Sequence, residues 1–298
     1  MPNLSNTVSA DVCLACGSDR LAVLPPSRAL GLQVAKCRSC GLRALTDRRT
    51  MTDSDDEIEA YDYDGYVTSL RGNLGQQRES VLSQLELDTR GRPDRSLFDL
   101  GGGDGAFCDQ ARKHGFAVTG NEISPEAIAL AKERYDVDLS LGTLDKLGLE
   151  NAHDVLTMWC VLAHVEDVDG LLSDTLKLLK PGGVMYMQTP RFTVMDRAAL
   201  FALKASDGRM TKLADSRIGT KHAQLHTVRS MTRLLERIGF TDVRAIPRAR
   251  FSLTSEYYLR AFGVPAGMAV PVGKAADAAI ASGAVPRIVL DVYARKPS

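Results

Sequence analysis

The stretch SLFDLGGGDGAFCDQ, residues 96–110, decides the fold class of this chain. Its first five residues are predominantly apolar, as in a buried strand, and the glycines that follow permit a tight turn. A helix is expected from about Ala106 to His114. Where a strand enters a helix through such a turn, backbone N–H groups point outward and a nucleotide-like ligand can approach them closely. The stretch therefore predicts the first unit of a ligand-binding α/β domain.

Strands and helices continue to alternate after this unit. The helix over residues 124–135 has the clearest local signals, with Ser124 as N-cap and Pro125 at the first helical position. Strands separated by helices in this way predict an α/β fold over residues 96–298: a Rossmann-like, seven-stranded, mostly parallel sheet with helices on both faces. Strands are expected over residues 97–100, 116–122, 137–142, 154–160, 184–190, 241–246 and 287–297, and further helices over residues 167–180 and 227–240.

The composition argues against several classes of protein. The 298 residues are 44% apolar and 25% charged, and the formal net charge is zero. A chain without a basic excess lacks the overall electrostatic signature of nucleic-acid binding. No run of 18 apolar residues is present, so no membrane-spanning helix is expected, and the first residues lack the basic and apolar regions of a signal peptide. We therefore expect a cytoplasmic protein whose thiols stay reduced.

Four of the six cysteines form two C-x-x-C pairs. Cys13 and Cys16 make the first pair, and Cys37 and Cys40 make the second after twenty intervening residues. Two such turns offer four converging thiolates, which suits tetrahedral zinc, and the glycine after each pair permits a tight turn. Two disulfides or a redox C-x-x-C are the alternatives, and both fit less well. The pairs predict a structural zinc ribbon over residues 1–46. The two other cysteines are expected to be small core residues, namely Cys108 and Cys160.

The segment between the ribbon and the sheet domain, residues 47–95, begins as an acidic linker. Seven acids and no bases fall within residues 53–64, which is typical of a solvated stretch. A helix is expected over residues 71–87. Three tyrosines near the end of the linker are expected either to pack on the main domain or to form a lid over a ligand: Tyr61, Tyr63 and Tyr66.

The glycine turn fits two ligand patterns. Gly101-x-Gly103-x-x-Ala106 fits the dinucleotide pattern, and Asp99-x-Gly101-x-Gly103-x-Gly105 fits that of S-adenosylmethionine (SAM) sites. A turn without a ligand is the third interpretation. Glu122 suits the two ribose hydroxyls of either cofactor. Asp99 separates the two, because a carboxylate there would repel a pyrophosphate but attract the ammonium and sulfonium groups of SAM. The sequence therefore predicts SAM.

Successive motifs also resemble those of class I SAM-dependent methyltransferases, namely LFDLGGGDGAF, TGNEISPEAIALAKER, DVLTMWCVLAHVEDVDGLL and LLKPGGVMYMQTP. The resemblance covers roughly residues 96–246. The double C-x-x-C-Gly resembles the zinc ribbon that precedes such domains in bacterial enzymes acting on sugars and secondary metabolites.

The resemblance implies a role for each matching residue. Asp99 lies beside the methionine end of SAM, Glu122 accepts the ribose hydroxyls, and Ile123 packs on the adenine. In the family, an acid that holds the adenine amino group often follows the glycine that corresponds to Gly142. In this chain Thr143 stands at that position. A backbone amide near Leu144 or the displaced Asp145 is therefore expected to make the contact instead. The implied cofactor-binding residues are Asp99, Gly101, Gly103, Gly105, Glu122, Ile123, Thr143, Leu144 and Trp159.

Three histidines are candidates for a general base. Methyl transfer is an in-line displacement in which positioning supplies much of the rate, and a base helps when the acceptor is a hydroxyl. The candidates are His164, His222 and His226, although each could instead make a structural hydrogen bond, and a base is not required. If their segment is helical, His222 and His226 share one face; no third metal ligand beside them is evident.

Residues 190–226 are expected to form a cap insertion. The segment lacks a strand pattern, follows the fifth strand on the ligand side of the sheet, and has a net charge of +4. It is expected either to be a solvated helical lid or to receive an anionic small-molecule acceptor such as a nucleotide-linked sugar.

The sequence therefore predicts a SAM-dependent methyltransferase that acts on an oxygen or carbon of a sugar or secondary metabolite. An RNA base methyltransferase with a zinc ribbon is one alternative, which the zero net charge and the acidic linker disfavour. A non-catalytic SAM-binding or zinc-scaffold protein is the other. The sequence fixes neither the acceptor, nor the methylated atom, nor the oligomeric state.

Overall fold

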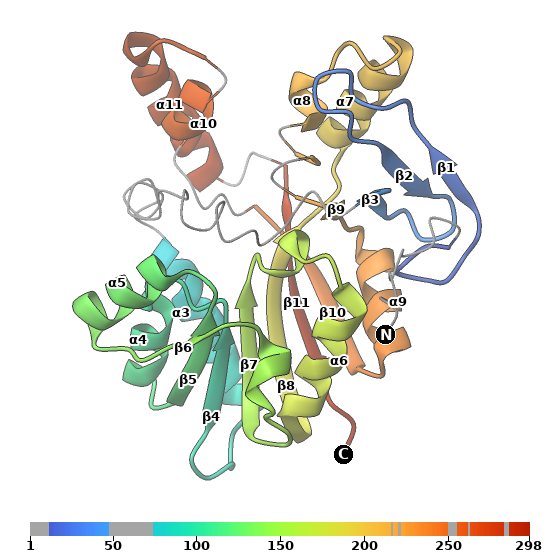
Figure 1. The fold of residues 1–298 in the computed structure, drawn as a ribbon. Coiled ribbons are helices and arrows are strands. Elements are labelled where there is room, and N and C mark those ends of the chain that lie inside the picture. The colour runs from blue at the N-terminus through green and yellow to red at the C-terminus, as the bar shows by residue number, and fades with distance from the viewer. Residues whose placement is uncertain are drawn as a thin grey trace.

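A computed structural model describes residues 12–47, 74–215, 217–219, 222–249, 255–261, 263–282 and 286–298. These residues form a seven-stranded sheet flanked by helices and a separate four-stranded sheet (Figure 1). The predicted acidic stretch 53–64 and its tyrosines lie outside the described residues. Across the described ranges, no helix has the combination of length and apolarity needed to cross a membrane.

The large sheet confirms the predicted fold class. Its strand order is β10-β11-β8-β7-β4-β5-β6. All neighbouring strands from β8 to β6 are parallel, whereas β11 runs antiparallel to both β10 and β8. The strands are β4 (Ser96–Leu100), β5 (Ala117–Glu122), β6 (Ser140–Leu141), β7 (His153–Trp159), β8 (Leu179–Pro190), β10 (Thr241–Arg248) and β11 (Val289–Arg295).

Helices cover both faces of this sheet, as the sequence predicts. Leu97 packs in one core cluster with α3 (Leu74–Asp88) and α4 (Ala106–Lys113), and α5 (Pro125–Tyr135) lies beside α4. Phe98 packs in another cluster with α6 (Val168–Leu178) and α9 (Val228–Ile238). Successive strand residues point to opposite faces, so each face receives its own apolar layer.

The structure differs from the predicted pattern at the boundary between α6 and β8 and between β10 and β11. The predicted helix 167–180 ends at Leu178, and β8 begins at Leu179. Both leucines are fully buried, and an extended backbone lets Leu179 pair with His153. Helices α10 (Ser255–Ala261) and α11 (Ala266–Ala281) lie between β10 and β11 and were not predicted. In α11, which is rich in alanine, the residues favour a helix by intrinsic propensity without leaving an amphipathic pattern.

The small sheet joins the N-terminal module to the predicted cap. Its order is β1-β2-β3-β9, and all of its pairs are antiparallel. The first three strands, β1 (Leu21–Val23), β2 (Val34–Cys37) and β3 (Arg43–Leu45), belong to the module, but β9 (Gln224–Leu225) comes from the segment 190–226. The segment thus contributes a strand although its sequence lacks a strand pattern, because β9 is stabilised by a partner far away in sequence. The segment also contains α7 (Val194–Ala205) and α8 (Lys212–Asp215).

Candidate functional site

The carboxylate of Glu122 holds the glycine turn between β4 and α4. The backbone N–H of Gly103 donates to Oε2 at 2.9 Å, and those of Ile123 and Ser124 donate to Oε1 at 2.7 and 3.1 Å. Glu122 is only 9% exposed, so these charge-assisted bonds replace most of its hydration. The end of β5 and the turn after β4 therefore form one polar unit, as the sequence pattern predicts.

The backbone of the turn requires glycine. Gly101 and Gly105 have φ angles of 71° and 76°, a region that side chains disfavour. A Cβ on Gly101 would lie 2.7 Å from Cγ2 of Val161, and one on Gly105 would lie 2.9 Å from Cβ of Ala131. The turn thus touches both α5 and the segment that follows β7.

Asp99 is a buried acid beneath this turn. Thr157 Oγ1 donates to Asp99 Oδ1 at 2.6 Å, and the Cys108 thiol donates to Oδ2 at 3.6 Å. Asp99 is 1% exposed, and burial raises its pKa to about 7, although the Thr157 bond and the positive charge of Arg78 act in the opposite direction. Cys108 is fully buried, as predicted, and additionally contacts this acid.

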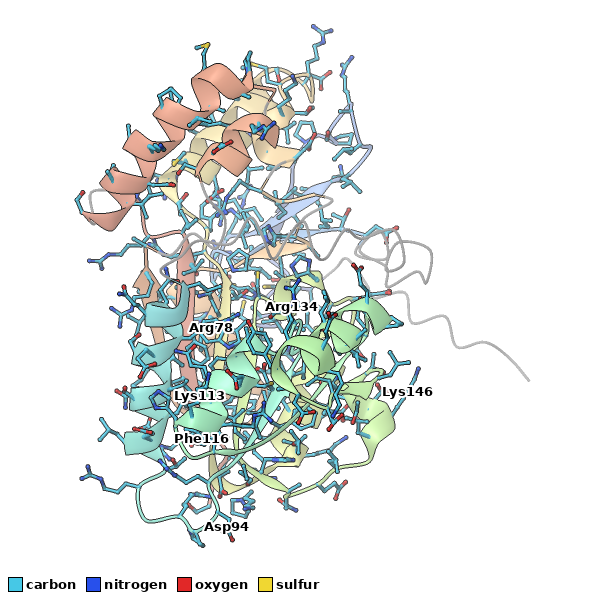
Figure 2. The ribbon with its side chains drawn as sticks, turned by 90° about the vertical axis from the view of Figure 1, so that its left-hand side faces the viewer. Arg78, Asp94, Lys113, Phe116, Arg134 and Lys146 are labelled. Carbon is cyan, nitrogen blue, oxygen red and sulfur yellow. The ribbon has the colours of Figure 1, made fainter. Side chains whose placement is uncertain are left out.

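Arg78 lies near Trp159 and Asp99 and was not among the residues predicted from the sequence. Arg78 lies on α3. Figure 2 shows it well away from Asp94, which precedes the first residue of β4, whereas the glycine turn follows the last residue of that strand. Its guanidinium lies 5.9 Å from the ring centroid of Trp159. Its Nε is buried without a hydrogen-bond partner among the described residues. Only its place on a predicted helix was visible in the sequence, so no signal pointed to the site.

Trp159 stands at the end of β7 in an aromatic cluster. Its ring centroid lies 5.1 Å from that of Phe107 and 5.0 Å from that of Tyr186. Trp159 is half-buried, and within the described chain its buried Nε1 lacks a hydrogen-bond partner. The Trp159 ring therefore packs against core aromatic side chains, while part of the residue stays exposed at the end of the strand.

The residues expected to contact the adenine lie near the ends of β5 and β6, and fewer contacts fix their positions than fix the glycine turn. Asn121 Nδ2 donates to the carbonyl of Gly142 at 2.7 Å and so joins the ends of β5 and β6. Ile123 is half-buried, and Thr143 precedes the short helix η2 (Leu144–Leu147). The Leu144 side chain is 6% exposed and packs into the core. Only its backbone is thus placed for a ligand contact.

The three candidate histidines separate into two groups. His164 ends the short helix η3 (Leu162–His164), and its ring centroid lies 5.3 Å from that of His222. His226 is fully buried, with Nδ1 3.3 Å from Ser230 Oγ, and burial lowers its pKa to about 3. His222 and His226 would share one face only if their segment were helical, and that condition is not met because strand β9 lies between them.

Cys160 joins His164 and His222. The ligand atoms of these three side chains all lie within 4.8 Å of one another. Cys160 is half-buried rather than a core residue, because it follows the last residue of β7 at the edge of the sheet.

The four ribbon cysteines also converge. Their Sγ atoms all lie within 4.8 Å of one another, with Cys13 and Cys40 at 3.5 Å and Cys16 and Cys37 at 3.7 Å. None forms a disulfide. The hydrogen bond with Cys40 lowers the pKa of Cys13 to about 5 and raises the pKa of Cys40. Four clustered thiols of this kind fit a tetrahedral zinc ion.

Comparison with known proteins shows the family. Residues 74–245 match the methyltransferase domain family; the ribbon lies outside this match. A ubiquinone biosynthesis O-methyltransferase of Paramagnetospirillum magneticum is 34% identical over 94 residues, 30% of this chain and 38% of the relative. The corresponding protein of Caulobacter vibrioides is 32% identical over 122 residues, 38% of this chain and 48% of the relative. The chain thus matches less than half the length of these two relatives.

Solved structures support the fold. Phosphoethanolamine N-methyltransferase 2 of Haemonchus contortus, in complex with SAM, has a TM-score of 0.53 at 18% identity and covers 85% of this chain and 60% of its own. The YcgJ protein of Bacillus subtilis has a TM-score of 0.52 at 13% identity, and the match covers 74% of this chain and 99% of YcgJ. This chain belongs to the methyltransferase domain family, and its predicted resemblance to class I SAM-dependent methyltransferases is confirmed.

Proposed function

We propose that this protein transfers the methyl group of SAM to a hydroxyl oxygen of a small-molecule acceptor. The observation that carries the proposal is the pair of buried acids on adjacent strands, Asp99 and Glu122, at the glycine turn. Two carboxylates so close to the turn disfavour the pyrophosphate of a dinucleotide and favour a cationic ligand.

The residues present fit SAM. Glu122 would accept the ribose hydroxyls, Asp99 would face the ammonium group, and Trp159 would line the methionine side. The buried Nε of Arg78 and Nε1 of Trp159 lack hydrogen-bond partners among the described residues, as expected of groups that face a ligand. When bound, SAM supplies an electrophilic methyl group on a sulfonium with a good leaving group.

The same reasoning supports one structural zinc ion on the N-terminal module. Cys13, Cys16, Cys37 and Cys40 would fill all four positions of a tetrahedral site, so zinc there would have no open position for substrate. We propose that this ion stabilises a module too small to fold on its own core.

The acceptor is proposed from two features. The curated relatives are named O-methyltransferases, which favours oxygen over carbon or nitrogen. The pKa of Lys36 is lowered mainly by the positive charge of Arg43, then by burial, and further by the positive charges of Arg197, Arg38 and Lys204. This basic cluster, between the ribbon and α7, supports an anionic acceptor such as a nucleotide-linked sugar. Arg217 does not belong to the cluster, because its Nε bonds to Asp196 at 2.8 Å.

His164 and His222 are the better candidates for contact with the acceptor. His164 is exposed and His222 half-buried, whereas His226 is fully buried and its low pKa disfavours protonation. An RNA base methyltransferase and a non-catalytic scaffold are not favoured by the comparisons.

Binding of S-adenosylhomocysteine is expected to strengthen by up to about tenfold between pH 6 and pH 8. Ionised Asp99 attracts the ligand's ammonium group, and burial holds the pKa of Asp99 at about 7. Because that pKa lies above the ordinary 3.8, the contribution of Asp99 to folding stability is present below pH 3.8 and is lost as pH rises through 7. Calorimetry across this range measures the affinity. Asp99→Asn should flatten the profile; an equally steep profile in that variant would refute the assignment.

A screen of acceptors for release of S-adenosylhomocysteine tests the proposed function. Turnover is expected with hydroxyl-bearing small molecules, and more with phosphorylated sugars than with their neutral counterparts. Arg197→Glu and Lys204→Glu should each raise the KM of an anionic acceptor about tenfold while leaving SAM binding intact. Lys113→Glu, on α4, is the matched charge control. Turnover of RNA alone, or none with any hydroxyl acceptor despite SAM binding, would contradict the proposal.

A further inference from the structure

We propose that Cys160, His164 and His222 form a binding site for a divalent transition-metal ion of the zinc class. Their ligand atoms lie within 4.8 Å of one another, and Cys160 Sγ lies 3.9 Å from His164 Nε2. Ligands around a tetrahedral zinc ion stand about 3.4–3.6 Å apart, given Zn–S and Zn–N distances of about 2.3 and 2.0–2.1 Å. Small side-chain rotations therefore suffice to form the site.

The imidazole ring of His222 is oriented by a hydrogen bond at Nδ1, the nitrogen that would not bind the metal. His222 Nδ1 lies 3.0 Å from the carbonyl oxygen of Arg217. A carbonyl only accepts, so Nδ1 must carry the proton and the lone pair is on Nε2. A backbone carbonyl on the second nitrogen is the usual support of a metal-binding histidine. Arg217 is itself held by Asp196 at 2.8 Å and by the carbonyl of Arg191 at 3.1 Å.

The segments that carry the three ligands are joined directly. The N–H of Ala223 donates to the carbonyl of Ala163 at 2.8 Å, and Gln224 Nε2 donates to the carbonyl of Leu162 at 2.8 Å. Hydrogen bonds on the residues next to both histidines therefore keep His164 and His222 together without any metal.

The backbone at Cys160 is also unusual. Its φ angle is 65°, which costs a non-glycine residue energy and tends to occur at functional sites. The conformation turns the chain sharply after Trp159, and the Cys160 N–H still bonds to the carbonyl of Gln188 at 3.0 Å. A thiol and two imidazoles form a ligand set that suits zinc rather than magnesium or calcium.

Three protein ligands leave one position of a tetrahedral ion open, as in catalytic zinc sites. Val161, next to Cys160, packs against the glycine turn at Gly101, so the ion would lie beside the proposed SAM site. Resting on the proposed function, we assign the open position to the acceptor hydroxyl. The hydroxyl proton passes to water, its oxygen forms the new bond to the methyl carbon, and the carbon–sulfur bond breaks to give S-adenosylhomocysteine.

Titration with Co²⁺ tests the site in the full-length protein that carries one zinc ion per chain, held in the ribbon, after removal of any more weakly bound metal. We expect a cobalt–thiolate charge-transfer band that saturates at one equivalent. Cys160→Ser should remove this band, and His222→Ala should weaken Co²⁺ binding more than about tenfold. His114→Ala is the matched histidine control and should change neither the charge-transfer band nor the affinity for Co²⁺. No band in the wild type would overturn the site. A charge-transfer band that survives in Cys160→Ser would also overturn the site, because the cobalt would then be bound by the ribbon cysteines.

Activity separates this inference from the proposed function. Release of S-adenosylhomocysteine should depend on the added metal and be lost in Cys160→Ser. Metal-independent turnover that Cys160→Ser retains would overturn the assignment of the acceptor to the metal. A cobalt site without turnover of any acceptor would support the site and count against the proposed function alone.

Discussion

Replacing Glu122 with alanine should weaken the binding of S-adenosylhomocysteine by about 10- to 150-fold, or about 1.5–3 kcal/mol. The side chain is the acceptor for the N–H groups of Gly103, Ile123 and Ser124. Its removal therefore loosens the glycine turn and also eliminates the proposed acceptor for the ribose hydroxyls. Calorimetry with purified ligand measures the change directly.

Two variants sharpen this prediction. Glu122→Gln keeps the shape and one carbonyl oxygen but loses the charge, so an intermediate loss of affinity is expected. Glu126→Ala removes a nearby exposed acid on α5 and should leave the affinity unchanged. If Glu122→Ala bound the ligand within twofold of the wild type, the carboxylate would have no role in cofactor binding.

Replacing Cys37 with serine should release the ribbon zinc and unfold the N-terminal module. Structural zinc sites contribute roughly 10–16 kcal/mol of binding free energy, which is also folding free energy. Ribbon cysteines share a core cluster with α9, and Thr227 Oγ1 donates to the carbonyl of Cys40 at 2.8 Å. Strand β9 would lose its partner β3, so His222 should also shift. We therefore expect a large fall in melting temperature and in activity.

Elemental analysis and thermal melting measure this outcome. The variant should contain one zinc ion fewer per chain than the wild type, and the ribbon should become sensitive to protease. Cys108→Ser, a buried cysteine outside the ribbon, is expected to keep its zinc. Unchanged zinc content and melting temperature in Cys37→Ser would show that the four thiols do not hold a structural metal.

The fold of the large domain was predictable because its signals are local. The glycine turn after Leu100 requires left-handed backbone angles that only glycine adopts without strain. Ser124 caps α5 as predicted, accepting the N–H of Ala127 at 3.2 Å. Alternating apolar runs then predict the strands and helices, and their alternation predicts a mostly parallel sheet. The antiparallel position of β11 between β10 and β8 was not predicted.

The polar unit at the glycine turn was predictable for the same reason. Glu122 and Gly103 stand at the junctions between strand and helix in two successive units, and parallel strands bring these junctions to the same edge of the sheet. The spacing of the cysteine pairs likewise predicted that their four sulfurs would converge.

Only the tertiary structure decided which residues beyond these motifs meet. Arg78 reaches Trp159 from α3, and β9, only two residues long, leaves no periodic signal because β3 stabilises it from far away in sequence. Cys160 and His222 are more than sixty residues apart in the sequence. The positive φ angle of Cys160 and the hydrogen bonds from Ala223 and Gln224 to the carbonyls of Ala163 and Leu162 bring them together. Sequence patterns report the backbone's local preferences, whereas such contacts depend on the packing free energy of the whole fold.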